Sequence, residues 1–233
     1  IFLFFLMTGI LISIWFFLRQ EETLLPENRK KTSLANFLAT IVQVCKIKVT
    51  LLYTIVIGLT SGAFLGYLKT SQVIFEVQYG LGKMFPFYFA SLAIAVGFAS
   101  LVNGQIVRKY GMRLLSQGAL YTIIACSSTL LLISMPFNGH PPLYLLLAFL
   151  MINFFCMGIL FGNLSSIAME PIGHIAGMGA AVIGSFSTLL AVPIGVFIGY
   201  QYAGNIYSLI FGFGICCLIS IFLIKIFDRQ TDS

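Results

Sequence analysis

The chain has 233 residues, of which 59% are hydrophobic and 9% are charged, and its mean hydropathy is +1.02. Soluble domains carry about 25% charged residues, so this composition excludes a soluble fold and indicates an integral membrane protein. The net charge of +6 would suit a nucleic-acid partner in a soluble protein, but here the charges flank apolar segments, so nucleic-acid binding is excluded.

Seven apolar segments are long enough to form membrane-spanning helices. A helix needs about 20 apolar residues to cross a hydrocarbon layer of about 30 Å. The pattern therefore predicts an all-α polytopic membrane protein with spans at 1–18, 49–68, 84–103, 114–135, 143–163, 177–200 and 206–227. The connections are short except for residues 19–48, a polar stretch followed by apolar residues at helical spacing. We expect the second part of this linker to form a helix on the membrane surface.

The first span begins at the first residue, Ile1, and the first basic residue, Arg19, follows it. A signal peptide has the opposite order, with its positive charge before the apolar region. We therefore expect the chain to begin inside or just before a spanning helix and to be the C-terminal part of a longer protein.

Basic residues indicate the orientation of the spans. Segment 103–113, with the sequence NGQIVRKYGMR, is expected to be a short turn and carries three of them, Arg108, Lys109 and Arg113. Because Lys and Arg are biased toward cytoplasmic loops, we expect this turn to be cytoplasmic. Alternation of the spans then leaves only two of the 13 Lys and Arg residues, Lys69 and Lys83, outside. It also places the C-terminus in the cytoplasm.

The ionisable and sulfur-containing side chains restrict the chemistry. All seven Asp and Glu residues fall in the expected connections or tails. Proton-coupled carriers need an ionisable group inside the membrane, so either the chain is not proton-coupled or its coupling group lies in another part. His140 and His174 also fall in connections, and the five cysteines are scattered without a C-x-x-C pair, which predicts free thiols. We expect no metal site.

The span 49–68 has two different faces. Three glycines recur every four residues, a pattern that lets a neighbouring helix approach closely: Gly58, Gly62 and Gly66. A step of about 100° per residue places aromatic and hydroxyl side chains on the other side. They are Tyr53, Thr60, Phe64 and Tyr67, and we expect them to line a cavity that holds an apolar molecule. The alternative is that they are ordinary lipid-facing or interfacial residues.

The span 143–163 carries Asn153 at its middle, with Met157 on the same face. An amide is unfavourable in lipid, so Asn153 is expected to face protein or a cavity. Two alternatives follow, a contact with substrate or a hydrogen bond to another helix. In the first, Asn153 and Met157 join the cavity residues of the span 49–68.

Two connections carry more specific motifs. Asn103, Gly104, Arg108, Gly111 and Arg113 resemble the C-terminal copy of the glycine and arginine turn of the major facilitator superfamily, without the aspartate of the fuller first copy. Segment 161–181 resembles one typical of the Bcr/CflA-type drug-resistance transporters of that superfamily. The matching residues are Gly162, Asn163, Ala168, Met169, Glu170, Pro171, Gly173, Ala176 and Gly177. With segment 71–80, the resemblance covers essentially the whole chain.

The resemblance implies proton-driven efflux of small amphiphilic drugs by alternating access, with no enzymatic activity and no cofactor. It also implies twelve helices, of which this chain carries the sixth to the twelfth. Residues 1–18 are then the last helix of the first half, 19–48 the cytoplasmic linker, and 49–233 the C-terminal six-helix bundle. Within that bundle, we expect three-helix repeats at 49–135 and 143–227.

The expected partners are the lipid bilayer, a drug, protons and the first half of the same transporter, in the bacterial inner membrane. The basic turn, with Arg108 and Arg113, is expected to act as a cytoplasmic gate that stabilises the outward-open state.

A seven-helix receptor is the main alternative, because it has the same number of spans and the same orientation. Three features argue against it. The longest connection directly follows the first span, no cysteine lies in an expected external loop, and no span carries a lysine for a retinal linkage. A non-transporting structural subunit is a further alternative.

Overall fold

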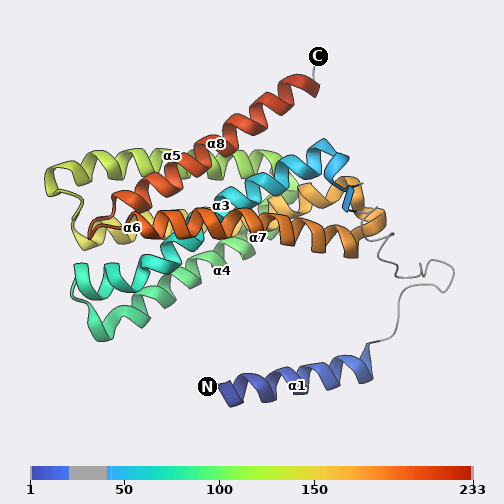
Figure 1. The fold of residues 1–233 in the computed structure, drawn as a ribbon, viewed down its shortest axis with the longest axis horizontal. Coiled ribbons are helices and arrows are strands. Elements are labelled where there is room, and N and C mark those ends of the chain that lie inside the picture. Colours follow the sequence, from blue (N-terminus) through green and yellow to red (C-terminus); the bar gives the residue numbers. More distant parts are fainter. Residues whose placement is uncertain (1, 21–40, 43, 232–233) are drawn as a thin grey trace. The chain divides into compact units, whose positions relative to one another are not determined.

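A computed structural model describes residues 2–20, 41–42 and 44–231 of the chain, and almost all of them are helical. Figure 1 shows these helices in chain order by colour. The chain divides into two units, residues 1–37 and 38–233. Among the described residues, seven helices are long and apolar enough to cross a membrane. The predicted fold class, an all-α polytopic membrane protein, is confirmed.

Within its described residues, 2–20, the first unit forms the helix α1 (Phe2–Arg19). Large apolar side chains are exposed on it, including Phe5 and Trp15, each 66% exposed. A helix that is apolar on all sides suits a membrane span. Most of the expected linker 19–48, including most of its expected surface helix, lies outside the described residues.

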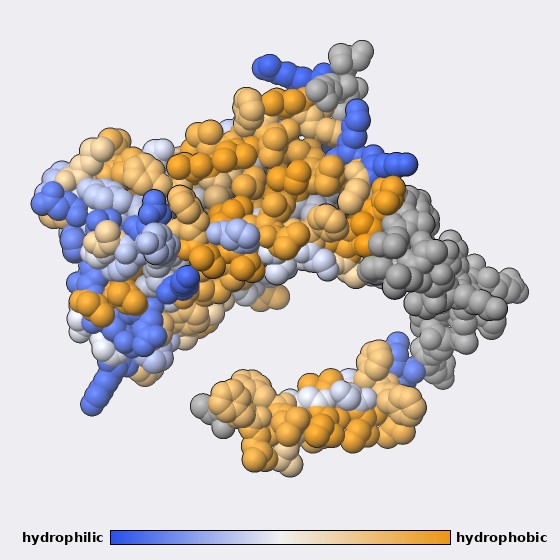
Figure 2. Space-filling view, viewed as in Figure 1, coloured by the Kyte–Doolittle hydropathy of each residue, from blue (hydrophilic) through white to orange (hydrophobic). Residues whose placement is uncertain are grey.

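The second unit contains the other six long helices and the short helices that connect them. In chain order they are α3 (Lys48–Gln72), the π-helix η2 (Val73–Gln78), η3 (Gly82–Met84), α4 (Phe85–Tyr110), α5 (Met112–Ser134), η4 (Met135–Phe137), α6 (Leu143–Met169), η5 (Glu170–Ile175), α7 (Ala176–Tyr200) and α8 (Tyr207–Thr231). Apolar residues cover the middle of this bundle and polar residues gather toward its ends (Figure 2).

Several helices run further than the expected spans. The prediction of a loop at 103–113 is wrong, because α4 continues through Arg108 to Tyr110 and α5 begins at Met112. The break is at Gly111 alone, with φ of 79° and ψ of 154°. Gly104 lies inside α4, where an added Cβ would meet nothing within 4 Å. Polar residues indicate where a helix leaves the membrane, but a helix can continue through them. The positive φ of Gly111 is what ends α4.

The prediction that every carboxylate lies in a connection or a tail is wrong for three of them, because the candidate spans extend to Gln78, Gly173 and Arg229. Glu76 lies on η2, Glu170 begins η5 and Asp228 lies near the end of α8. Each of the three therefore lies on a helix, in a segment close to one end of the bundle. We call the end of the bundle with the α4–α5 break and η5 the basic end. The "opposite end" is the one with η2, η3, η4 and the α7–α8 connection.

Two helices, α3 and α6, have the most neighbours in the bundle. Helix α3 packs on α6, α7 and α8, and α6 packs on α3, α4 and α5, while α5 also packs on α8. By comparison, α4 contacts α5 little and α7 contacts α8 little. If α3 is exchanged with α6, α4 with α7 and α5 with α8, the same pairs of helices remain in contact.

Glycines set the distance between α3 and α7. A Cβ added to Gly58, Gly62 or Gly66 would lie 2.8, 2.7 or 2.7 Å from a side-chain carbon of Leu190, Ile194 or Ile198, respectively. Gly195 of α7 stands in the same relation to Leu65, at 2.7 Å. The glycines thus replace side chains that would otherwise separate the two helices, the role expected for a G-x-x-x-G pattern.

The Gly62→Leu variant is expected to destabilise the bundle by about 1–3 kcal/mol, because a side chain there overpacks the contact with Ile194. Thermal unfolding in detergent can be followed with a thiol-reactive dye, since Cys156, Cys216 and Cys217 are free and buried. The matched control is Gly104→Leu, which adds the same side chain in open space. Equal melting temperatures for the two variants would contradict this account of the contact.

Candidate functional site

The six residues expected to line a cavity lie on α3 and α6, two helices that pack on each other. Five are buried and Phe64 is half-buried; the buried ones are Tyr53, Thr60, Tyr67, Asn153 and Met157. The alternative of lipid-facing side chains therefore does not describe these five. We call the contact between α3 and α6 the central seam.

Aromatic rings from three helices meet at the central seam. Phe154 of α6 lies at the middle, with its ring centroid 4.8 Å from that of Tyr67 and 5.2 Å from that of Phe64. Phe161 lies 5.6 Å from Phe64, and Phe89 of α4 stacks on Tyr67 at 6.5 Å. These five rings form what we call the aromatic cluster. Such ring pairs contribute about 0.5–1.5 kcal/mol each beyond the burial of their area.

Two buried polar atoms of the seam have no hydrogen-bond partner within the described part of the chain: the Tyr67 hydroxyl and Asn153 Oδ1. The amide of Asn153 is satisfied on its other side, because Nδ2 donates to the Phe149 carbonyl at 2.7 Å. Leaving a buried polar group unpaired costs about 1–3 kcal/mol. The Thr60 hydroxyl, by contrast, has a hydrogen-bond partner, because it donates to the Val56 carbonyl at 2.9 Å. Among the six candidate residues, Tyr67 and Asn153 thus carry the fully buried polar atoms that have no partner in the described part of the chain.

At the basic end, the two segments that carry the sequence motifs are joined by side-chain hydrogen bonds. Asn103 Nδ2 donates to Asn163 Oδ1, and Asn163 Nδ2 donates to Asn103 Oδ1, both at 2.9 Å. Asn163 is only 3% exposed, so this amide pair fastens α4 to α6 from a buried position. Sequence reasoning named both residues but missed their pairing, because the register between the two helices cannot be read from either motif.

The basic residues and several other motif residues are more open. Arg108, Lys109 and Arg113 are exposed, and none of them forms an ion pair with another described residue; the Lys109 ammonium lies 5.2 Å from the Tyr110 ring. Glu170 and Pro171 begin η5. A Cβ at Gly173 or Gly177 would meet nothing within 4 Å, so no close contact in the structure requires a glycine at either position.

At the opposite end, hydrogen bonds connect three loops that are distant in the sequence. The Tyr79 hydroxyl donates to the Pro141 carbonyl at 2.6 Å, and the Tyr202 hydroxyl donates to Gln78 Oε1 at 2.9 Å. The Gly139 carbonyl accepts from the Ile206 backbone N–H at 3.2 Å. Burial raises the pKa of Tyr79 to about 12, with a smaller contribution from Tyr202. Sequence reasoning missed this cluster, since ordinary loop residues form it.

The amide pair can be tested by a double-mutant cycle. Asn103→Leu is expected to cost about 1–3 kcal/mol, because it leaves the buried Asn163 amide without its partner. Replacing both residues by Leu removes both unpaired groups and is expected to cost less than the sum of the single changes. The melting temperatures of the parent, the two single variants and the double variant in detergent give the coupling energy between the two residues. Additive effects would show that the pair does not act as a unit.

The pKa of Tyr79 predicts a loss of stability at alkaline pH. Its ordinary pKa is 10.0, and in the folded chain it is about 12. The unfolded chain therefore releases the proton first, so the contribution of Tyr79 is complete below pH 10.0 and disappears as pH rises to about 12. Unfolding in detergent between these pH values should show a smaller loss of stability for Tyr79→Phe than for the parent. An identical pH dependence would contradict the assignment.

Comparisons with known proteins give the family. The chain matches the model of the Major Facilitator Superfamily over residues 1–196. It is 24% identical over 192 residues to an uncharacterized MFS-type transporter, YdgK, of Bacillus subtilis (strain 168), an alignment that covers 82% of this chain and 47% of that protein. The chain thus spans about half the length of this relative. No solved structure gives a significant match.

These matches point to a transporter and not to an enzyme, and they do not favour the receptor alternative. The apolar helices agree with the match, since seven of the described helices are long enough to span a membrane. With most of its length matched by the family model, the chain belongs to the major facilitator superfamily.

Proposed function

We propose that this chain is the C-terminal part of a proton-coupled transporter that exports small amphiphilic drugs, of the Bcr/CflA type. The family match supports transport of a small molecule across a membrane. The subtype rests on the resemblance of segments 103–113 and 161–181. The observation that carries the proposal is the central seam, where the unpaired Tyr67 hydroxyl belongs to the aromatic cluster and Asn153, with its unpaired Oδ1, directly precedes Phe154.

The chemistry of the seam suits an amphiphilic ligand. Sites for such molecules are mostly apolar, with a few polar groups that fix orientation. The aromatic cluster supplies the apolar surface, while the Tyr67 hydroxyl can donate and Asn153 Oδ1 can accept. Both atoms are buried, so substrate entry requires the rings to move. Phe64, Phe89 and Phe161 are the half-buried rings of the cluster, so a ligand meets them before the buried Tyr67 and Phe154.

The packing of the bundle supports a half-transporter with internal symmetry. Members of this superfamily consist of 3+3 inverted repeats in each half, with substrate between the halves near the midplane. The main contacts stay the same when α3, α4 and α5 are exchanged with α6, α7 and α8. Two such repeats, 49–135 and 143–227, would produce this equivalence. We assign residues 1–18 to the last helix of the other half and 19–48 to the linker.

Proton coupling is assigned to the other half. The carboxylates on the described helices of the bundle, Glu76, Glu170 and Asp228, all lie in segments near its ends. Glu76 already accepts a hydrogen bond from Gln72 at 3.0 Å. Because a coupling group must change its charge inside the membrane, we place it outside this chain.

The basic end is assigned to a cytoplasmic gate. The guanidinium groups of Arg108 and Arg113 have no ion-pair partner among the described residues, and both side chains are exposed. They are therefore free to bind a carboxylate or helix C-terminus of the other half in one conformation. The amide pair of Asn103 and Asn163 holds α4 against α6 at this end.

Substitution in the seam tests the proposal. In the complete transporter, Phe64→Ala and Asn153→Ala are expected to change the set of exported drugs, each by tenfold or so for individual compounds, because a polar contact or ring contact is worth on the order of 1 kcal/mol or more. Drug accumulation in cells and protein levels in the membrane are the measurements.

The matched control is Phe222→Ala, which removes a ring of α8 that is 60% exposed and is expected to leave the drug profile unchanged. Absence of energy-dependent export for every drug, with the protein present in the membrane, would refute the proposed function. An unchanged profile in both seam variants would remove the seam from the substrate path but leave transport intact.

A further inference from the structure

The aromatic cluster of the central seam continues toward the opposite end of the bundle. The ring centroid of Phe85, the first residue of α4, lies 5.6 Å from that of Phe89 in the cluster. The ring of Phe75, on η2, lies 6.0 Å from Phe85 and stacks on Tyr88 at 5.9 Å with an interplanar angle of 5°. We call Phe75, Phe85 and Tyr88 the end rings, and the aromatic cluster together with the end rings the ring array.

The ring array differs from the other aromatic contacts of the described residues. It contains eight rings, and the centroids of neighbouring rings lie between 4.8 and 6.5 Å apart. The other contacts join only two rings each: Phe4 with Phe5, Phe98 with Phe155, and Phe149 with Phe213. A continuous series of rings from η2, α3, α4 and α6 is therefore a distinct feature of this part of the bundle.

The ring array runs along the bundle from the opposite end to beyond the middle of α6. Phe75 and Phe85 lie at the opposite end, on η2 and at the start of α4. Phe154 lies near the middle of α6, and Phe161 lies seven residues further toward the basic end, roughly 10 Å along the helix axis. The array thus connects the proposed substrate site with the end that is external if the basic end is cytoplasmic.

The rings of the array are partly accessible. Those that are half-buried are Phe64, Phe85, Tyr88, Phe89 and Phe161. A ligand that places its own ring against an aromatic side chain gains roughly two- to tenfold in affinity for each ring pair, beyond the effect of the buried area. A saturated ring of the same size buries a similar area but lacks this contribution. The array therefore favours ligands with a planar aromatic ring.

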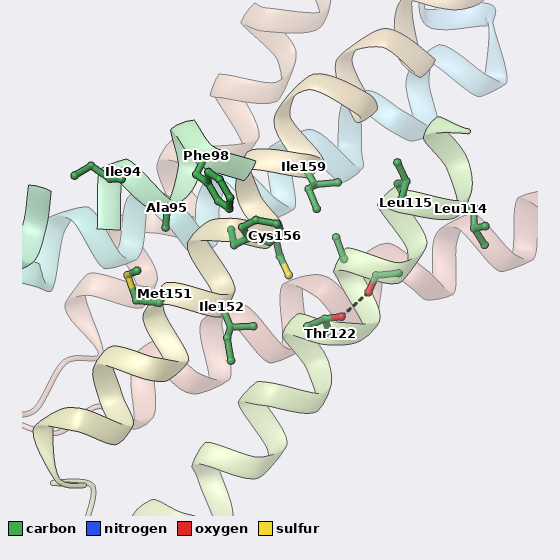
Figure 3. A pocket seen from close by; sticks show the side chains of 13 residues that line it. Ile94, Ala95, Phe98, Leu114, Leu115, Thr122, Met151, Ile152, Cys156 and Ile159 are labelled. Atoms are coloured by element: carbon green, nitrogen blue, oxygen red, sulfur yellow. Dashed lines mark hydrogen bonds between the residues drawn. The ribbon is translucent and has the colours of Figure 1, made fainter. Parts of the chain in front are cut away.

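A separate feature of the bundle supplies a control ring. An apolar groove of about 730 Å³ lies among α4, α5 and α6, and no ring of the array lines it. Phe98 of α4 lines the groove (Figure 3), as do Phe155 of α6 and Gly118 of α5. A Cβ added to Gly118 would meet nothing within 4 Å. Phe98 thus lies on the same helix as Phe85 but outside the array.

We infer that the transported molecule carries a planar aromatic ring and leaves the central seam along the end rings. This inference rests on the proposed function and adds to it a substrate class and a route. A series of weak sites of one kind lets a molecule bind and still move on, as in other multi-site pathways. Phe85 is the specificity-determining residue of the route, because it joins the end rings to the cluster through Phe89.

The test compares two quaternary amines that differ only in their ring system, naphthylmethyl-trimethylammonium and its decahydronaphthyl counterpart. Their shared positive charge is attracted to the faces of aromatic rings and prevents both compounds from crossing the lipid unaided. Energy-dependent uptake of the radiolabelled compounds is measured in inside-out membrane vesicles that contain the complete transporter. We expect the naphthyl compound to be transported roughly two- to tenfold faster than the saturated one.

Matched substitutions on α4 separate the route from general packing. Phe85→Leu should slow transport of the naphthyl compound roughly two- to tenfold and leave the saturated compound unchanged. Phe85→Tyr keeps the ring and should retain the parent rate. Phe98→Leu, the control outside the array, should change neither compound. Binding of the naphthyl compound to purified Phe85→Leu transporter should equal that of the parent, since the central seam is intact in this variant. If Phe85→Leu does not reach the membrane, Tyr88→Leu decides.

Three outcomes would overturn the inference and leave the proposed function in place. They are equal transport of the two compounds by the parent, an equal decline for both in Phe85→Leu, and transport of neither compound while other drugs are exported. Absence of energy-dependent transport of every compound by the parent, with the protein present in the membrane, would refute the proposed function and this inference with it.

Discussion

The close contact between α3 and α7 is the constraint on which much of the bundle depends. Without side chains at Gly58, Gly62 and Gly66, the ridge of α7 can lie directly against α3. The opposite side of α3 is then free to face α6, where Tyr67 and Phe64 meet Phe154. Helices in a membrane gain no hydrophobic energy from leaving lipid, so such close van der Waals packing provides much of their association. Helix α3 therefore needs both faces, the glycine face to pack closely on α7 and the aromatic face to pack on α6.

Two sets of amide and hydroxyl side chains within the bundle differ in whether they are hydrogen-bonded. The amide pair of Asn103 and Asn163 is satisfied on both sides and acts as a fastening between helices. By contrast, the Tyr67 hydroxyl and Asn153 Oδ1 are buried without partners in the described part, as are the hydroxyls of Ser116, Ser127 and Ser208 outside the central seam. Folding alone does not favour an unpaired polar atom in a low-dielectric interior. This contrast assigns the first pair to architecture; the proposal that Tyr67 and Asn153 contact substrate also depends on their place beside the aromatic residues Phe64 and Phe154 of α3 and α6.

Symmetry of contacts does not produce symmetry of surfaces. The pairs α3–α7 and α6–α4 correspond under the exchange of three-helix groups, as do α3–α8 and α6–α5. Side chains then make the two sides different. Ile198 fills the space beside α8, whereas Gly118 leaves the space beside α4 open. One backbone arrangement can thereby form a closed contact on one side and an open apolar groove on the other.

The sequence by itself determined the class, the seven apolar helices and the two faces of α3, because span length and helical periodicity are local properties of the chain. It did not determine where helices end. Segment 103–113 reads as a loop by polarity, yet the backbone breaks only at Gly111. Nor did it show that Asn103 meets Asn163, that Tyr79 reaches Pro141, or that Gly118 faces open space. These facts depend on the register and distance between helices that are far apart in the sequence, which only tertiary packing decides.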